Sequence, residues 1–233
     1  MNTNLILGAS LSALLLACPA SAGIVINELF YHAPDDVEDL QWIELHNPDR
    51  EPVDVSGWRL TRGVEFRFSE ASVLPAGGFV VLCKNATLFA EFYEAKVDGE
   101  FTKSLGRGGD TVELVDASGK LVDRVDYDDH NPWPSSADGT SASLERITPG
   151  ASGQLADNWS ASPLPEDMKR PAGTPGRVNA SYSVNFPPSI SGLTVSPRDP
   201  APGQPIGVRA IIEHHDGLET VELRYRVARS GVV

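Results

Sequence analysis

The feature that most constrains this chain is a series of short apolar stretches that alternate with polar residues and are separated by glycine and proline. The clearest stretch is residues 41–47, where Trp42 and Glu44 point to one side and Ile43 and Leu45 to the other. Alternation with a period of two residues is the pattern of a β-strand. The chain has 21 glycines and 18 prolines among 233 residues, and these residue types mark turns. We therefore expect a protein built from β-strands.

One window alone is typical of a helix. Residues 86–93 place their apolar side chains on one face, and Asn85 stands where a capping side chain is needed. Closely spaced strands with a single helix predict an all-β fold, a two-sheet immunoglobulin-like sandwich. The strands are expected at residues 24–31 (half-buried), 41–47, 53–60, 64–68, 79–83 and 143–147, and in a hairpin of 111–115 and 120–127 around a turn at 116–119.

The first residues have the pattern of an export signal. The apolar run Leu5–Leu16 is too short to span a bilayer, and Ala20-Ser21-Ala22 has the form of a cleavage site. We expect cleavage after Ala22, a secreted or cell-surface location, and no transmembrane span once the signal is removed. A lipoprotein attached through Cys18 is the less favoured route, because Pro19 follows that cysteine. A buried N-terminal helix is the remaining alternative.

Cysteine content and charge narrow the class of protein. Cleavage would leave Cys83 as the single cysteine, in an apolar run where a buried, inert thiol is expected. The formal net charge is −13, and residues 181–233 contain equal numbers of acidic and basic side chains, so the negative charge lies before them. An acidic surface repels phosphate backbones, so nucleic acid is not an expected partner.

The positions of the apolar stretches, glycines and prolines along the chain predict four parts. We expect a signal peptide at 1–22, a β-sandwich domain at 23–160, a Pro/Gly-rich C-terminal extension and linker at 161–185, and an incomplete immunoglobulin-like domain at 186–233. The last part shows only three strand signals, at 190–195, 206–212 and 219–227. A sandwich needs about seven strands, so we expect a truncated second β-sandwich and a natural protein that continues further.

Several of these stretches together resemble the lamin-tail domain found in secreted bacterial proteins. The similarity covers about residues 24–179 and rests on the stretches 26–29, 39–47, 53–60, 74–82, 109–114, 122–127, 133–134, 143–146 and 173–179. The resemblance implies an immunoglobulin-like sandwich without enzymatic activity. It also implies an accessory part of an exported multidomain protein, next to hydrolase or spore-coat-kinase-like domains. Gln41 stands where the family pattern has glutamate.

Three stretches of the sequence could form a binding site, and each also has a simpler interpretation. The acidic run Asp35–Asp39 could bind Ca²⁺, but it lacks the spacing of a calcium loop, so a solvated loop is favoured. Residues 126–131 form a better cluster for a metal. Trp133, between two prolines, could offer an exposed platform for a ligand, whereas Trp58 is expected in the core. None of these patterns selects specific residues, so we expect no catalytic, cofactor-binding or metal-binding residues and no cofactor.

The expected function is a noncatalytic binding or structural module of an exported, multidomain bacterial protein. Its ligand would be a protein or a surface polymer. The alternative is an N-terminal accessory region of an extracellular enzyme, either a hydrolase or a spore-coat-kinase-like protein, whose catalytic domain lies downstream of Val233.

Overall fold

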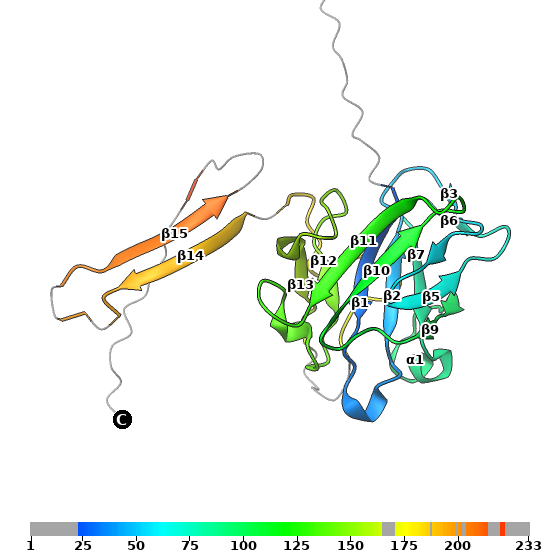
Figure 1. The fold of residues 1–233 in the computed structure, drawn as a ribbon, viewed down its shortest axis with the longest axis horizontal. Coiled ribbons are helices and arrows are strands. Elements are labelled where there is room, and N and C mark those ends of the chain that lie inside the picture. Colours follow the sequence, from blue (N-terminus) through cyan, green and yellow to red (C-terminus); the bar gives the residue numbers. More distant parts are fainter. Residues whose placement is uncertain are drawn as a thin grey trace, which may run out of the picture.

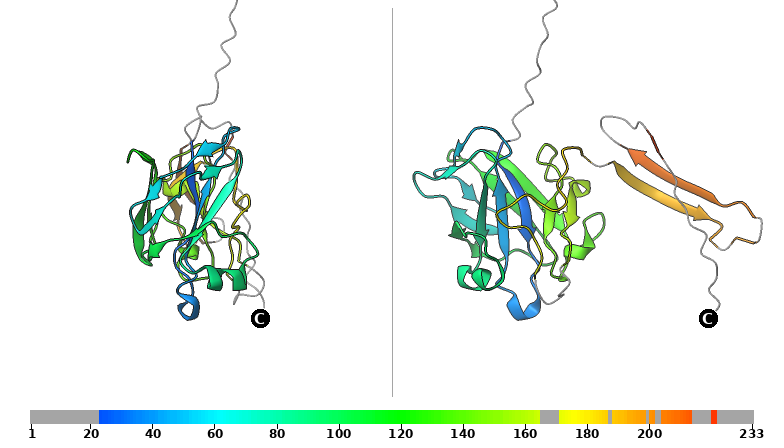
Figure 2. Two further views of the ribbon diagram at one scale, coloured as in Figure 1. Left: turned by 90° about the vertical axis from the view of Figure 1, so that its right-hand side faces the viewer. Right: turned by 180° about the vertical axis from the view of Figure 1, so that it is seen from behind.

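The computed structural model describes residues 23–164, 171–186, 188–198, 200–201, 204–213 and 220–221. The predicted signal peptide, Cys18 and most of the strand expected at 219–227 lie outside the described residues. Two sheets face each other and form an immunoglobulin-like β-sandwich with one α-helix, which confirms the predicted fold class (Figures 1 and 2). None of the helices in the described part of the chain is both long and apolar enough to cross a bilayer.

The first sheet has six strands, in the spatial order β13 (Trp159–Ala161), β12 (Leu144–Arg146), β1 (Val25–Phe30), β2 (Trp42–His46), β7 (Phe79–Cys83) and β8 (Gly99–Glu100). The second has five, in the order β11 (Leu121–Asp128), β10 (Gly109–Val115), β4 (Arg59–Leu60), β5 (Val64–Arg67) and β9 (Thr102–Lys103). A small pair, β3 (Val53–Asp54) and β6 (Val73–Leu74), and three 3₁₀ turns at Asp35–Val37, Ser135–Ala137 and Ala156–Asn158 complete the sandwich.

The alternation in β2 sets which side chains fill the space between the sheets. Ile43 and Leu45 lie in the main hydrophobic core, as the sequence predicts. Trp42 lies on the opposite face, in a second apolar cluster that helix α1 (Ala86–Phe92) covers through Phe89. Asn85 caps this helix, as predicted, by accepting a hydrogen bond from the backbone N–H of Leu88 at 3.0 Å.

Strand β1 was expected to be half-buried, and this is wrong, because all six of its residues are buried. The second sheet covers its inner face, while α1 and a C-terminal segment cover the outer face of its sheet. A β-bulge between Ile26 and Glu28 interrupts the pairing with β2. As a result, Ile26 and Leu29 both reach the core although they are an odd number of positions apart, with two residues between them. The adjacent polar residues, Asn27 and Glu28, turn to the outer side.

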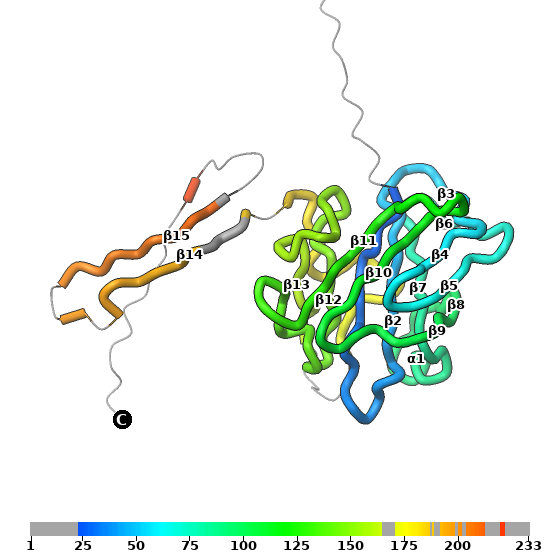
Figure 3. Tube along the Cα trace, viewed as in Figure 1, coloured from blue at the N-terminus to red at the C-terminus, as the bar shows by residue number. Residues whose placement is uncertain are grey.

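The C-terminal segment consists of residues 172–181, and we call it the strap. It can be followed by its yellow colour in Figure 3. Its first backbone N–H, that of Ala172, donates to Ser141 O at 2.7 Å. Just beyond its end, the backbone N–H of Ser183 donates to Ile147 O at 2.9 Å. The strap therefore lies along the sandwich within the segment that the sequence predicts as extension and linker.

The remaining described residues include a two-stranded antiparallel sheet of β14 (Ser189–Ser196) and β15 (Gly207–Glu213). Both strands were expected from the sequence, at 190–195 and 206–212. Several of their apolar side chains are exposed, including Leu193 at 65% and Ile211 at 56%.

Candidate functional site

Acidic side chains of the loop at residues 35–39 form ion pairs with basic side chains of the protein. Arg107 contacts Asp35 at 2.8 Å and Glu38 at 3.0 Å, and Lys84 contacts Asp39 at 2.5 Å. These basic side chains come from other segments of the β-sandwich domain. The negative charge of the loop is therefore partly neutralised within the protein.

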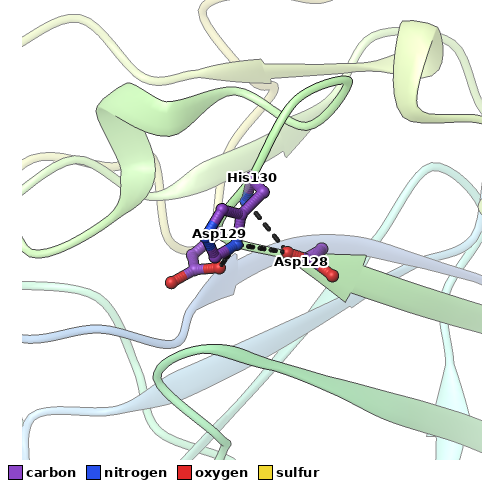
Figure 4. A group of neighbouring side chains, drawn as sticks. All are labelled: Asp128, Asp129 and His130. Atoms are coloured by element: carbon purple, nitrogen blue, oxygen red, sulfur yellow. Dashed lines mark hydrogen bonds and ion pairs between the residues drawn. The ribbon is translucent and has the colours of Figure 1, made fainter.

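The cluster at the end of β11 brings two carboxylates and a histidine together (Figure 4). Their ligand atoms lie within 4.8 Å of one another, which makes Asp128, Asp129 and His130 a group that could hold a metal ion. His130 Nδ1 is 3.0 Å from Asp128 Oδ1 and also contacts Asp129. The hydrogen bond with Asp128 and the two negative charges raise the pKa of His130. The His130 side chain is 83% exposed, so an internal ion pair on an open loop accounts for the arrangement.

Trp133 does not form the exposed platform that its flanking prolines indicated. It is only 8% exposed and lies in the main core, with its ring centroid 6.2 Å from that of Trp159. Trp58, expected in the core, is only partly buried and packs against it from the edge. A tryptophan between two prolines was interpreted as a surface residue, but the loop folds its ring inward.

The most densely bonded polar group in the sandwich was not identified from the sequence. Glu28, Glu44 and Glu145 come from three adjacent strands, β1, β2 and β12, and each has 0% of its surface exposed. Burying a charged carboxylate is costly unless it is paired and hydrogen-bonded. Among the described residues, none of the three forms an ion pair with lysine, arginine or histidine.

The three glutamates bond to the backbone of the strap instead. The N–H of Thr174 donates to Glu28 Oε1 at 2.9 Å, the N–H of Gly176 to Glu44 Oε2 at 2.5 Å, and the N–H of Ser181 to Glu145 Oε2 at 2.8 Å. Three strands therefore each hold one point along the strap. A backbone N–H can donate to a carboxyl oxygen whether the group is ionised or protonated.

Side chains complete the network. Ser143 donates to Glu28 Oε1 at 2.5 Å, and Asn27 Nδ2 donates to Glu44 Oε1 at 2.8 Å and to Asn179 Oδ1 at 2.8 Å. Asn179 Nδ2 in turn donates to the carbonyls of Asn27 at 3.0 Å and Arg146 at 2.9 Å. The bulge in β1 is what allows Asn27 and Glu28 to contribute to the same network.

Burial dominates the electrostatics of these carboxyls. Desolvation, reinforced by the charge of Glu145, raises the pKa of Glu28 from 4.5 to about 8. Desolvation and the charge of Glu28 raise the pKa of Glu44 to about 9. The hydrogen bonds to the strap lower both values but do not outweigh burial. These groups therefore favour the protonated form near neutral pH.

Two surface hollows flank Phe79, and the strap forms part of both. One, of about 370 Å³, is lined by Phe79 together with Pro175 and Gly176 of the strap. The other, of about 260 Å³, is lined by Phe79, Val178 and Tyr182. The ring of Phe79 is stacked on His46, with centroids 4.3 Å apart, and burial lowers the pKa of His46, which favours its neutral form. The stacked rings of Phe79 and His46 offer an aromatic surface suited to contacts with a ligand, beside the charged Lys96 and Asp98 that also line the larger hollow.

Comparison with known protein families gives one match. Residues 18–129 match the family model described as Lamin Tail Domain. The match supports the lamin-tail resemblance that the sequence motifs carry. It includes Glu28 and Glu44, whereas Glu145 and the strap lie beyond the matched residues. A search of curated proteins found no match.

One sequence signal covers the residues of the glutamate network but does not indicate that they contact one another. All three glutamates, and strap residues Thr174 and Asn179, lie inside the stretches that carry the lamin-tail resemblance. The sequence interpretation gave the three glutamates no role, and it placed Thr174 and Asn179 in the predicted extension and linker.

Proposed function

We propose that residues 23–184 act as a noncatalytic binding or structural module of an exported, multidomain bacterial protein. The proposal rests on one observation, which is that the buried glutamates bind a segment of the protein itself. Glu28, Glu44 and Glu145 each bond to the backbone of the strap, so these carboxyls stabilise the fold and are not directed at a substrate. The lamin tail match and the run Leu5–Leu16 ahead of Ala22 support the module and its export.

The binding surface that we propose is the pair of hollows beside Phe79. Tyr182 is 47% exposed and Val178 is 56% exposed, so both offer apolar area at the rim of one hollow. Aromatic side chains in such positions contribute much of the binding energy at interfaces. The ligand would be a protein or a surface polymer of the producing cell.

The test compares two matched variants of the purified fragment 23–184. Tyr182→Ala removes an exposed side chain from the hollow, whereas Leu121→Ala removes an equally exposed one, at 48%, from β11 of the other sheet. Binding to surface polymers and envelope proteins of the producing cell should weaken about tenfold for Tyr182→Ala, the effect of losing about 1.4 kcal/mol. Leu121→Ala should bind like the unaltered fragment. Equal binding by all three would place the ligand elsewhere.

A further inference from the structure

The hydroxyl of Thr174 lies between two buried carboxyl groups. Its Oγ1 is 2.8 Å from Glu28 Oε2 and 3.2 Å from Glu145 Oε1, and the amide oxygen of Asn179 is further away, at 3.4 Å. A threonine hydroxyl has one proton and can donate it to only one of these oxygens. Toward the other carboxyl it must accept. The pair of contacts is therefore complete only when one of the two carboxyls carries a proton.

The other oxygens of these groups are already occupied by donors that cannot reverse. Glu28 Oε1 accepts from the backbone N–H of Thr174, and Glu145 Oε2 accepts from that of Ser181. The Thr174 N–H also lies 3.2 Å from Glu28 Oε2, so it is shared between the two oxygens of Glu28, and the Thr174 hydroxyl is the closer partner of Oε2. Glu44 differs, because each of its oxygens has an N–H donor of its own, from Asn27 and from Gly176. The position available for a shared proton is thus the line Glu28 Oε2, Thr174 Oγ1, Glu145 Oε1.

The charge of Glu145 favours keeping a proton on Glu28, and none of the other groups that the structure describes around this line is a base that could offset a carboxylate there. Glu44 and Glu145 are the carboxyls that face Glu28 from neighbouring strands, and the phenol of Tyr93 faces it from the end of α1. In the described part of the chain no basic side chain pairs with any of the three glutamates. A proton is the compensation that remains for a carboxylate removed from water.

We propose that Glu28, Thr174 and Glu145 share one proton that fastens the strap to the sheet, and that losing this proton at alkaline pH releases the strap. Released from the sheet, Glu28 would return to the ordinary pKa of an exposed carboxyl. With the strap docked, the pKa of Glu28 is raised from 4.5 to about 8. The docked form therefore holds the proton more tightly, and docking weakens as pH rises through this window. The equilibrium constant for release increases up to tenfold per pH unit, and levels off above the upper value.

Release of the strap would change the surface as well as the stability. Pro175 and Gly176 line one hollow beside Phe79, and Val178 and Asn179 line the other. Both hollows exist only while the strap is docked. The shared proton would therefore determine whether the two hollows beside Phe79 are formed.

Hydrogen exchange of the full-length protein between pH 4 and pH 9 tests the proposal. Rates for peptides that cover residues 172–181 are divided by their intrinsic rates at each pH, and peptides from β10 and β11 serve as the internal reference. We expect the opening constant of the strap to rise with pH, with Glu28 contributing up to tenfold per unit until about pH 8, while the reference stays constant. Strap protection that does not change with pH would overturn the proposal.

Substitution of Glu28 tests whether the shared proton, and not another titrating group, causes the strap to be released at high pH. In Glu28→Gln the amide can donate to Thr174 Oγ1 and accept from the Thr174 N–H, as the protonated carboxyl does. We expect this variant to keep the strap docked and to lose the part of the pH dependence that belongs to Glu28, while Glu44, which also bonds the strap and has a pKa raised to about 9, keeps its own part. A loosened strap at pH 5, or the pH dependence of the unaltered protein, would contradict the shared proton.

A second pair of variants decides the matter if Glu28→Gln does not fold. Thr174→Ser retains the hydroxyl and should retain the pH profile of strap exchange. Thr174→Val keeps the size of the side chain but removes the hydroxyl, so the strap should be loose and its pH profile changed. Identical pH profiles for the two variants would refute the role of the hydroxyl.

Discussion

Replacing Gly173 by alanine should detach the strap with little effect on the rest of the sandwich. Gly173 has a φ of +110°, and a Cβ built on it would lie 2.8 Å from Trp42 Cζ2 and 3.0 Å from Glu28 Oε1. The backbone conformation is unfavourable for alanine by about 1–2 kcal/mol, and overpacking against a buried tryptophan adds about 1–3 kcal/mol. We therefore expect the docked strap to lose about 2–5 kcal/mol.

Gly77→Ala is the matched control for this substitution. Gly77 also has a positive φ, of +63°, but a Cβ there would meet nothing within 4 Å. It should lose only the conformational contribution, about 1–2 kcal/mol. Hydrogen exchange of residues 172–181 measures the local effect, and urea unfolding measures the global one. If the amides of the strap are equally protected from exchange in the two variants, then the close approach of the strap to the sheet is not the reason for glycine at position 173.

Three further predictions follow from buried contacts. Trp133→Ala should cost about 3–5 kcal/mol, because its ring lies in the core, and clearly more than Trp58→Ala; denaturant midpoints compare them, and a larger shift for Trp58 would contradict this packing. Gln41→Glu should destabilise by about 2–5 kcal/mol, because its amide donates to two buried carbonyls; the loss should shrink in acid, where a protonated carboxyl regains one donor, and an equal loss at pH 4 and pH 8 would argue against this. The fragment 23–184 should unfold cooperatively at a higher temperature than 23–160, and equal melting temperatures would show that the strap adds no stability.

The elements that could be predicted are those whose conformation is indicated by neighbouring residues in the sequence. The alternation in residues 41–47 placed Ile43 and Leu45 in the core, and the cap at Asn85 located α1. Strands β6, β8, β9 and β13 were missed because each has only two or three residues. A strand that short has no measurable period, and its pairing partner decides its conformation.

The glutamate network could not be read from any local pattern. Glu28 and Glu44 are polar residues in strands, and such positions normally face water. Whether they are buried depends on a segment about 130 to 146 residues further along the chain, as the bonds to Gly176 and Thr174 show. Trp133 was misplaced for the same reason, because a partner at Trp159 determines where its ring lies.

The position of the strap bears on where the first module ends. A Pro/Gly-rich segment has little apolar area to bury, and its composition alone is that of a linker. Here the bonds come from the sheet, through three carboxyls spaced across adjacent strands. Such bonds are directional and depend on protonation, whereas apolar contacts depend on neither. A segment held in this way is integral to the fold under one condition and free under another, so the boundary of the module is itself a function of pH.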